Sequence, residues 1–255
     1  MTQIQQTATK LRGLKLTGMA GAYVAQVEQP RLYDFSFDER LAMIVDAELT
    51  TRENRKLRRI IAAANFPERA VIEDLDAHPA RGLDPAFVAF LANGDWIRLL
   101  QNLILIGPTG VGKTWLICAL AMQACRRGES VLFRRCSELY GAIALSLADG
   151  TAPKLKLALA KPALLILDDL GLGGIPEQVA GFLLDVIDRR QHRGSLAITS
   201  QFPIERWHGF FADPSMAEAI LDRVVHQAHR LNMQGESLRK AHGAARLGLG
   251  QGGER

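Results

Sequence analysis

The sequence predicts an α/β protein: a five-stranded parallel sheet flanked by helices, preceded by a small all-helical region. Three observations lead to this prediction. Residues 1–64 are polar with apolar positions at helical spacing, residues 65–95 are punctuated by proline and glycine, and from residue 96 short apolar runs alternate with helical patterns. Alternation of strand and helix is typical of a parallel sheet with helical crossovers.

The N-terminal region is predicted to be helical. Ser36 and Glu39 have the spacing of a capping box, which begins a helix whose apolar positions continue to Ala64. Residues 65–95 are predicted to be a connector with a short helix near 84–92. We therefore place a helical domain at 1–65, a connector at 66–95, an α/β domain at 96–243 and a flexible glycine-rich tail at 244–255.

The α/β region contains five predicted strands. They lie at residues 102–106, 130–133, 163–167, 196–199 and near 229–233. Helices are predicted at 113–126, from about Ser137, at 176–191, and from Ser215, where Ser215 and Glu218 form a second capping-box pattern; residues 149–153 are predicted to be a loop. Because only about 20 residues follow the fifth predicted strand, we expect no full C-terminal helical lid.

Composition bounds the class of protein. The 255 residues carry a formal charge of +4, an excess too mild to indicate nucleic-acid binding by itself. Cys118, Cys125 and Cys136 lack metal-site spacing and are expected to be buried free thiols, as in a reducing cytoplasm. No apolar run approaches the length of a membrane span, and no signal peptide is recognisable, so we expect a cytoplasmic protein without a membrane partner.

Residues 107–114 carry the most specific local chemistry. They read Gly107, Pro108, Thr109, Gly110, Val111, Gly112, Lys113 and Thr114, and match G-x-x-x-x-G-K-[ST]. Backbone N–H groups of such a loop surround phosphate oxygens, the lysine reaches the β- and γ-phosphates, and the threonine hydroxyl binds Mg²⁺. An apolar strand before the loop and a helix after it favour a nucleotide site over a plain glycine turn. The predicted ligands are ATP and Mg²⁺.

Polar residues at two strand ends complete the predicted ATPase site. Asp168 and Asp169 end the apolar run Leu164–Leu167, where a Mg²⁺-associated acid belongs. Asp168 is the expected metal-side carboxylate. Asp169 either orients the attacking water or only caps the turn before Gly171. At the end of the next strand, Ser200 or Gln201 is a candidate contact for the γ-phosphate, and a simple polar strand end is the alternative.

With these motifs in place, the chain resembles the IstB-like ATPase helpers of insertion-sequence transposases. These belong to the AAA+ group and are close to the DnaC-type helicase loaders. The resemblance covers nearly the whole chain and includes Asp46-Ala-Glu48 with Arg52, Arg81-Gly-Leu-Asp84, Trp96-Ile97, Thr199-Ser-Gln201, Ala219-Ile-Leu-Asp-Arg223 and Gly235-Glu-Ser-Leu-Arg239-Lys240. The chain departs from the family at Trp115, where a histidine often follows the Lys-Thr pair, a position that we expect to affect packing more than chemistry.

The resemblance implies an ATP-dependent homo-oligomer that binds DNA and engages a transposase. It places Arg223 as an arginine finger that contacts the neighbouring subunit's γ-phosphate. The alternative for Arg223 is a helix-surface residue paired with Asp222 or Glu218. The resemblance also makes Arg239 a candidate second sensor of the nucleotide.

A basic helix face is the predicted DNA contact. Arg52, Arg55, Lys56 and Arg59 follow helical spacing and share one face. Such a face neutralises phosphates of duplex DNA without reading sequence, although a stripe of this kind is commonly just a solvated surface. Lys154 and Lys156 are further candidates.

Two other functions fit parts of the sequence. A helicase loader shares the ATPase core and would differ in its N-terminal region and its partner. A small-molecule P-loop kinase would leave the basic helix unexplained.

Overall fold

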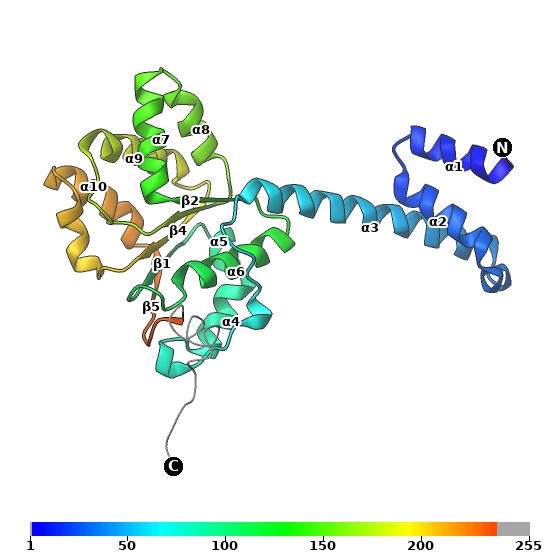
Figure 1. Cartoon of the computed structure of the whole chain (residues 1–255), viewed down its shortest axis with the longest axis horizontal. Helices are drawn as coiled ribbons and strands as arrows, with labels where there is room; N and C mark the ends of the chain where they lie inside the picture. Colours follow the sequence, from blue (N-terminus) through cyan, green and yellow to red (C-terminus); the bar gives the residue numbers. More distant parts are fainter. Residues whose placement is uncertain (1, 239–255) are drawn as a thin grey trace, which may run out of the picture. The chain divides into compact units, whose positions relative to one another are not determined.

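The computed structural model describes residues 2–238, which fall into two compact units (Figure 1). One unit extends through Arg59, and the other begins at Ile60. This division falls inside a long helix, ahead of the predicted domain boundary at residue 65.

The N-terminal unit is helical. Its elements are α1 (Gln3–Gly13), α2 (Thr17–Glu28), the 3₁₀ helix η1 (Pro30–Asp34) and α3 (Phe37–Ala64), the last of which continues past the unit's end. The capping box predicted at the start of α3 is present: Ser36 N donates to Glu39 Oε2 at 2.8 Å, and Glu39 N donates to Ser36 Oγ at 3.3 Å. This reciprocal pair satisfies two backbone donors that would otherwise lack partners.

The connector contains more helical segments than the one short helix that was predicted. It contains the short 3₁₀ helices η2 (Ile72–Asp74) and η3 (Pro79–Arg81), then α4 (Pro85–Asn93) and α5 (Asp95–Arg98). Asp84 caps α4 by accepting hydrogen bonds from Ala86 N and Phe87 N, and Pro85 occupies the first turn, where its missing N–H is not needed. The predicted helix near 84–92 is confirmed as α4.

The C-terminal unit contains one parallel sheet. Its strands are β1 (Asn102–Ile106), β2 (Val131–Arg135), β3 (Leu164–Asp168), β4 (Ser195–Ser200) and β5 (Ala228–Asn232), in the order β2-β3-β4-β1-β5. All four pairings are parallel. The loop after β1 and the acids that end β3 therefore meet at the same edge of the sheet, because parallel strands end together.

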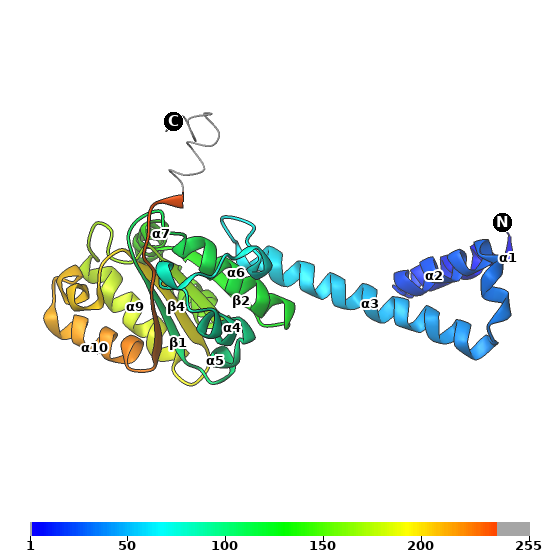
Figure 2. The same ribbon diagram turned by 90° about the horizontal axis from the view of Figure 1, so that it is seen from below.

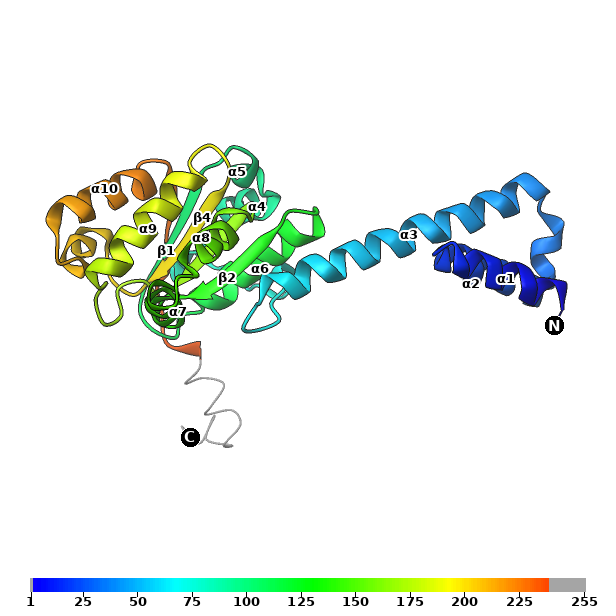
Figure 3. The ribbon, with the colours of Figure 1, turned by 90° about the horizontal axis from the view of Figure 1, so that it is seen from above.

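Helices cover both faces of this sheet (Figures 2 and 3). They are α6 (Lys113–Arg126), α7 (Cys136–Ala148), α8 (Ala152–Ala160), α9 (Glu177–Arg190) and α10 (Pro214–Val225), with the 3₁₀ helix η4 (Ile204–Phe210). α6 packs against β1, β2, β3 and β4 and contacts α4, and α9 packs against α7, α8 and α10. Strands covered on both faces explain the nearly continuous apolar runs in the sequence. The predicted α/β architecture is confirmed.

Two local predictions were wrong. The loop predicted at 149–153 is shorter, because α8 begins at Ala152 and Pro153 lies in its first turn, a position that tolerates proline. The capping box at Ser215 does not form. Asp213 caps α10 instead, accepting a hydrogen bond from Ser215 N at 2.8 Å.

Cys118, Cys125 and Cys136 are buried and free, as predicted, and burial raises the pKa of each thiol to about 12. No helix among residues 2–238 is both long and apolar enough to cross a membrane. The predicted tail at 244–255 lies outside the described residues. Most of the chain after β5, where no full C-terminal lid was expected, also lies outside them.

Candidate functional site

The glycine-rich loop connects β1 to α6 at the carboxyl edge of the sheet. Gly110 and Gly112 have φ angles of +88° and +98°, a left-handed region that side chains rarely adopt. Gly112 directly precedes the first turn of α6, whose N–H groups lack intrahelical partners. The loop and the helix end together form an anion-binding site.

Lys113 is held inside this loop. Its Nζ donates to Gly107 O at 2.7 Å and to Pro108 O at 2.9 Å, and the residue is only 6% exposed. The ammonium group therefore already lies among the atoms that surround a phosphate in such loops.

Thr114 and Asp168 are brought together across the sheet edge. Thr114 Oγ1 donates to Asp168 Oδ1 and Oδ2 at 3.0 and 3.2 Å, and Asp168 is completely buried. Burial raises the pKa of Asp168, while hydrogen bonds from Thr199 and Thr114 act in the opposite direction. A hydroxyl and a carboxylate this close are hard oxygen donors of the kind that Mg²⁺ prefers, so the residues fit that metal.

Asp169 follows β3 in a strained conformation, with φ of +60°. Its backbone N donates to Thr199 Oγ1 at 2.9 Å. A cation that the sequence did not reveal lies beside both acids: Arg135 Nε, at the end of β2, is 3.8 Å from Asp168 Oδ2 and 4.0 Å from Asp169 Oδ2. Strand register accounts for this approach, since Arg135 pairs with Asp168.

Ser200 and Gln201, the two candidates for a γ-phosphate contact at the end of β4, have different surroundings. Ser200 is buried, and its hydroxyl donates to Leu170 O at 2.8 Å. Gln201 instead reaches the glycine-rich loop, where its Oε1 accepts a hydrogen bond from Thr109 Oγ1 at 2.7 Å. Of the two side chains, only that of Gln201 contacts the loop.

A cleft of about 180 Å³ opens at this edge. Its lining residues are Glu68, Thr109, Gly110, Gly112, Lys113, Thr114, Trp115, Asp169 and Leu238. The chain after β5 lies directly against the loop, because Leu238 N donates to Gly110 O at 2.9 Å. Arg239, the predicted second sensor, lies outside the described residues.

Arg223 lies at the opposite edge of the sheet. Asn102, the first residue of β1, donates from Nδ2 to Arg223 O and Val224 O at 3.4 and 3.0 Å, whereas the loop follows the last residue of β1. A five-residue strand spans roughly 15 Å, so Arg223 cannot reach the loop of its own chain. The alternative pairing with Asp222 or Glu218 was wrong: the Arg223 Nε lies 2.5 Å from Asp188 Oδ1 of α9. Arg223 also lines a larger hollow of about 710 Å³ at this edge.

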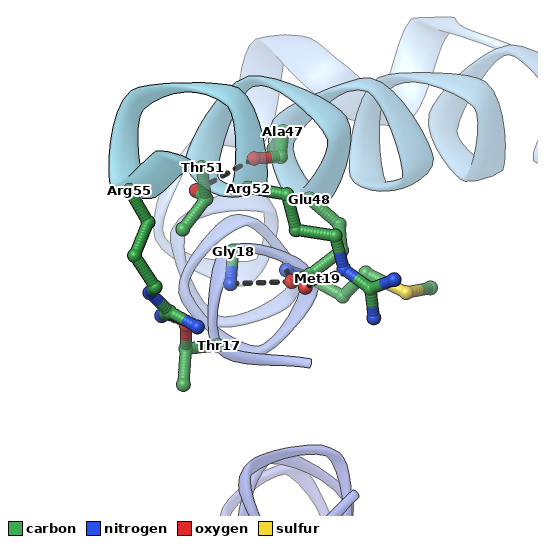
Figure 4. Close-up of polar contacts among 8 residues, drawn as sticks. All are labelled: Thr17, Gly18, Met19, Ala47, Glu48, Thr51, Arg52 and Arg55. Carbon is green, nitrogen blue, oxygen red and sulfur yellow. Dashed lines mark hydrogen bonds and ion pairs between the residues drawn. The ribbon is translucent and has the colours of Figure 1, made fainter. Parts of the chain in front are cut away.

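Two residues of the predicted basic face, Arg52 and Arg55, make polar contacts within the N-terminal unit (Figure 4). Arg52 Nε lies 2.8 Å from Glu48 Oε1, and Glu48 Oε2 accepts hydrogen bonds from Gly18 N and Met19 N at the start of α2. Arg55 donates to Thr17 Oγ1 at 2.8 Å. Lys56 and Arg59 are exposed.

The two candidate lysines on α8 differ in their surroundings. Lys156 is paired with Asp185 and lies 5.1 Å from the ring centroid of Phe182. Lys154 is exposed. The structure therefore leaves Lys154 accessible and holds Lys156 against α9.

Comparison with known proteins identifies the family in which this combination of loop, acids and N-terminal helices is placed. Residues 9–245 match the family described as IstB-like ATP binding protein. The chain belongs to this family. It is 42% identical to the insertion sequence ATP-binding protein y4pL of Sinorhizobium fredii, over 92% of this chain and 96% of that protein. It is 44% identical to the insertion sequence IS1162 ATP-binding protein of Pseudomonas fluorescens, over 78% and 87% of the two chains.

Solved structures agree on the AAA+ P-loop fold of this IstB-like chain. The crystal structure of DnaI is similar with a TM-score of 0.57 and 23% identity, over 69% of this chain and 94% of that one. The DnaC helicase loader is similar with a TM-score of 0.50 and 16% identity, over 69% and 99%. At this level of identity the likeness concerns the fold alone.

Proposed function

We propose that this protein is an ATP-hydrolysing, DNA-binding helper of a transposase that assembles with copies of itself on duplex DNA. The observation that carries the proposal is the separation of Arg223 from the loop of its own chain. A cation near the end of α10 completes a nucleotide site only if the site belongs to a neighbouring copy. A head-to-tail contact of this kind repeats from copy to copy and builds a ring or a filament.

The nucleotide site supports the same idea. The cleft of about 180 Å³ is small beside the ~300–1,000 Å³ of typical ligand pockets, so a bound nucleotide leaves surface for a neighbour to cover. Lys113 would exchange its carbonyl partners for the β- and γ-phosphates, Gln201 would contact the terminal phosphate, and Thr114 and Asp168 would hold Mg²⁺. The metal would neutralise charge on the phosphates as the terminal phosphate leaves.

Within this site, Asp169 would orient the attacking water, and Arg223 of a neighbouring copy would stabilise the charge that develops. Arg223 is paired with Asp188 until a phosphate competes for it. This exchange links assembly to the nucleotide. ATP favours the assembled state, and hydrolysis releases it.

The candidate DNA contacts in each unit follow from exposure and charge. Arg52 is paired with Glu48 on its own helix and Arg55 donates to Thr17 of α2, whereas Lys56 and Arg59 on α3 are exposed cations, as is Lys154 on α8. We assign them the main phosphate contacts and leave Lys156 out. Replacing Lys56 and Arg59 by glutamine together should lower the slope of log affinity against log salt by about 2.

A mixing experiment tests the shared site. Lys113→Ala and Arg223→Ala should each lack ATPase activity with duplex DNA. An equal mixture should regain activity, since about a quarter of random interfaces combine an intact loop with an intact Arg223. Size and DNA affinity of the unmodified protein should also differ between ATP and ADP. An inactive mixture, or a protein indifferent to nucleotide, would refute the proposal.

The choice of partner rests on the relatives. Those that cover most of this chain are named for insertion sequences, whereas the helicase loader is similar in fold alone. We therefore favour a transposase over a replicative helicase. A pull-down with purified candidates of both classes distinguishes them, and capture of the helicase alone would reverse the assignment.

A further inference from the structure

The hydroxyl group of Thr199 touches both acids of the nucleotide site. Thr199 Oγ1 donates to Asp168 Oδ1 at 2.7 Å and accepts from Asp169 N at 2.9 Å. One small group thus contacts the side chain of the first acid and the backbone of the second. The phosphate-contact candidates Ser200 and Gln201 come from the same strand end, but neither makes this pair of contacts.

Strand register places Thr199 there. β3 and β4 are paired with Leu167 opposite Ile198, so the next positions along the two strands bring Asp168 beside Thr199. Both residues are 0% exposed. A buried carboxylate needs its hydrogen-bond donors, because water is not available to replace them.

The hydroxyl also has a defined direction. It carries a single proton, which goes to Asp168, and this leaves a lone pair for the N–H of Asp169. The two bonds reinforce each other, because each favours the same rotamer of Thr199.

The turn after β3 depends on the same strand end. Asp169 has φ of +60°, a conformation that costs free energy in a residue with a side chain. Leu170 N donates to Thr199 O at 2.8 Å, and Ser200 Oγ donates to Leu170 O at 2.8 Å. These backbone-directed bonds hold the turn, and the Thr199 hydroxyl links it to the carboxylate of Asp168.

We propose that Thr199 is a positioning residue that sets the metal-side carboxylate of Asp168 and the water-orienting carboxylate of Asp169 relative to each other. The inference rests on the proposed ATPase function. Thr199 acts through the two acids, because its hydroxyl donates to Asp168 and accepts from Asp169 N. Its loss should therefore affect Mg²⁺-dependent turnover while binding of metal-free ATP is retained.

The test compares Thr199→Val, which keeps the shape and removes the hydroxyl, with Thr199→Ser, which keeps the hydroxyl. Loss of a hydrogen bond to a buried charged group should lower kcat about 10- to 100-fold in Thr199→Val and raise the Mg²⁺ concentration for half-maximal activity. Affinity for ATP in EDTA should stay within about twofold. Thr199→Ser should recover kcat to within about threefold of the unmodified protein.

Ser146→Ala is the matched control for the loss of a buried hydroxyl. Ser146 donates to Ile143 O at 2.8 Å within α7 and touches neither acid. It should lower thermal stability without changing Mg²⁺ dependence. If Thr199→Val does not fold, Thr199→Ala removes the same hydroxyl with a smaller side chain.

The outcomes separate this inference from the proposed function. Normal kcat and normal Mg²⁺ dependence in Thr199→Val would overturn the role of Thr199, as would a Thr199→Ser variant equally impaired. If the unmodified protein shows no turnover, the proposed function fails. Thr199 is then tested by the gain in ATP affinity on adding Mg²⁺, which Thr199→Val should reduce and Thr199→Ser should retain.

Discussion

Replacing Gly18 by alanine tests how closely α2 and α3 pack in the N-terminal unit (Figure 4). A Cβ atom on Gly18 would lie 2.5 Å from both Ala47 O and Thr51 Oγ1, and 2.7 Å from Glu48 Cα. Two of these three atoms belong to the backbone of α3, so they cannot rotate out of the way. Gly18 N also donates to Glu48 Oε2 at 2.7 Å, and any separation of the helices stretches that bond.

The magnitude follows from two opposing terms. Moving the new Cβ to ordinary contact distance shifts the first turn of α2 by about 1 Å, and overpacking of this kind costs about 1–3 kcal/mol. Alanine in place of glycine in a helix returns about 1 kcal/mol. With backbone atoms in the way, the upper part of the range applies. Gly18→Ala should destabilise the N-terminal unit by about 1–2 kcal/mol.

Gly21→Ala is the matched control, because both glycines lie in α2. A Cβ on Gly21 meets nothing within 4 Å. Only the helix-propensity term remains, so Gly21→Ala should stabilise the unit by about 0.5–1 kcal/mol. The two substitutions are chemically identical and should have opposite signs.

Hydrogen exchange followed by mass spectrometry is the assay, because it reports on each segment separately, whereas one melting temperature would mix the two units. Peptides from α2 and from α3 up to Arg59 report on the N-terminal unit, and peptides from the sheet serve as the internal reference. Gly18→Ala should speed exchange in the first set, and Gly21→Ala should slow it. Slower exchange in both variants would refute the close packing.

Three further predictions concern single side chains. The guanidinium of Arg190 is buried and donates to the carbonyl oxygens of Leu159, Ala160, Pro162, Ala163 and Ser195. Arg190→Met leaves these acceptors without a donor and should lower the free energy of unfolding of the sheet unit in urea by at least about 3 kcal/mol; a loss below about 1 kcal/mol would contradict this. The hydrogen bond from Arg52, with others from Met19 and Gly18, holds the pKa of Glu48 below its ordinary value of 4.5. Ionised Glu48 therefore stabilises the packing of α2 on α3 at pH values above 4.5, and this stabilisation is lost as pH falls through the lowered pKa. Glu48→Gln should abolish the resulting loss of helical circular dichroism at acid pH. A Glu48→Gln profile identical to that of the unmodified protein would argue against this role of Glu48. Gly110 has φ of +88°, and a Cβ atom there would lie 2.1 Å from Ser237 Oγ. Gly110→Ala should therefore weaken ATP binding, measured by calorimetry, at least about tenfold. Gly141→Ala, whose Cβ atom meets nothing within 4 Å, is the control and should bind ATP normally.

Local chemistry explains which features were predictable. The loop at 107–114 is contiguous, so its glycines, lysine and threonine identify it without tertiary information. The Ser36 capping box formed for the same reason, since its two partners are three residues apart. The Ser215 box failed because Asp213, two residues earlier, is a competing cap that pattern matching did not weigh.

Contacts between segments that are far apart in the sequence were harder to predict. Arg135 and Thr199 reach the acids because three strands are in one particular register, which no local pattern specifies. Arg52 and Arg55 were predicted to contact DNA, and their helical spacing was correct. Arg52 pairs with Glu48 on the same helix, Glu48 in turn accepts from Gly18 N of α2, and Arg55 donates to Thr17 of α2. The contacts with α2 join residues that are 30 or more positions apart in the chain, so no local pattern reveals them.

The sequence by itself determined the nucleotide loop, the strand–helix alternation and the family, because each of these is written in neighbouring residues or in their order. The tertiary structure decided which polar side chain at the end of β4 does what: Thr199 contacts both acids, Ser200 anchors the following turn and Gln201 reaches the loop. It also decided that Arg223 lies beyond the reach of its own site. Both outcomes follow from the direction and register of parallel strands, which bring together residues that the chain keeps far apart.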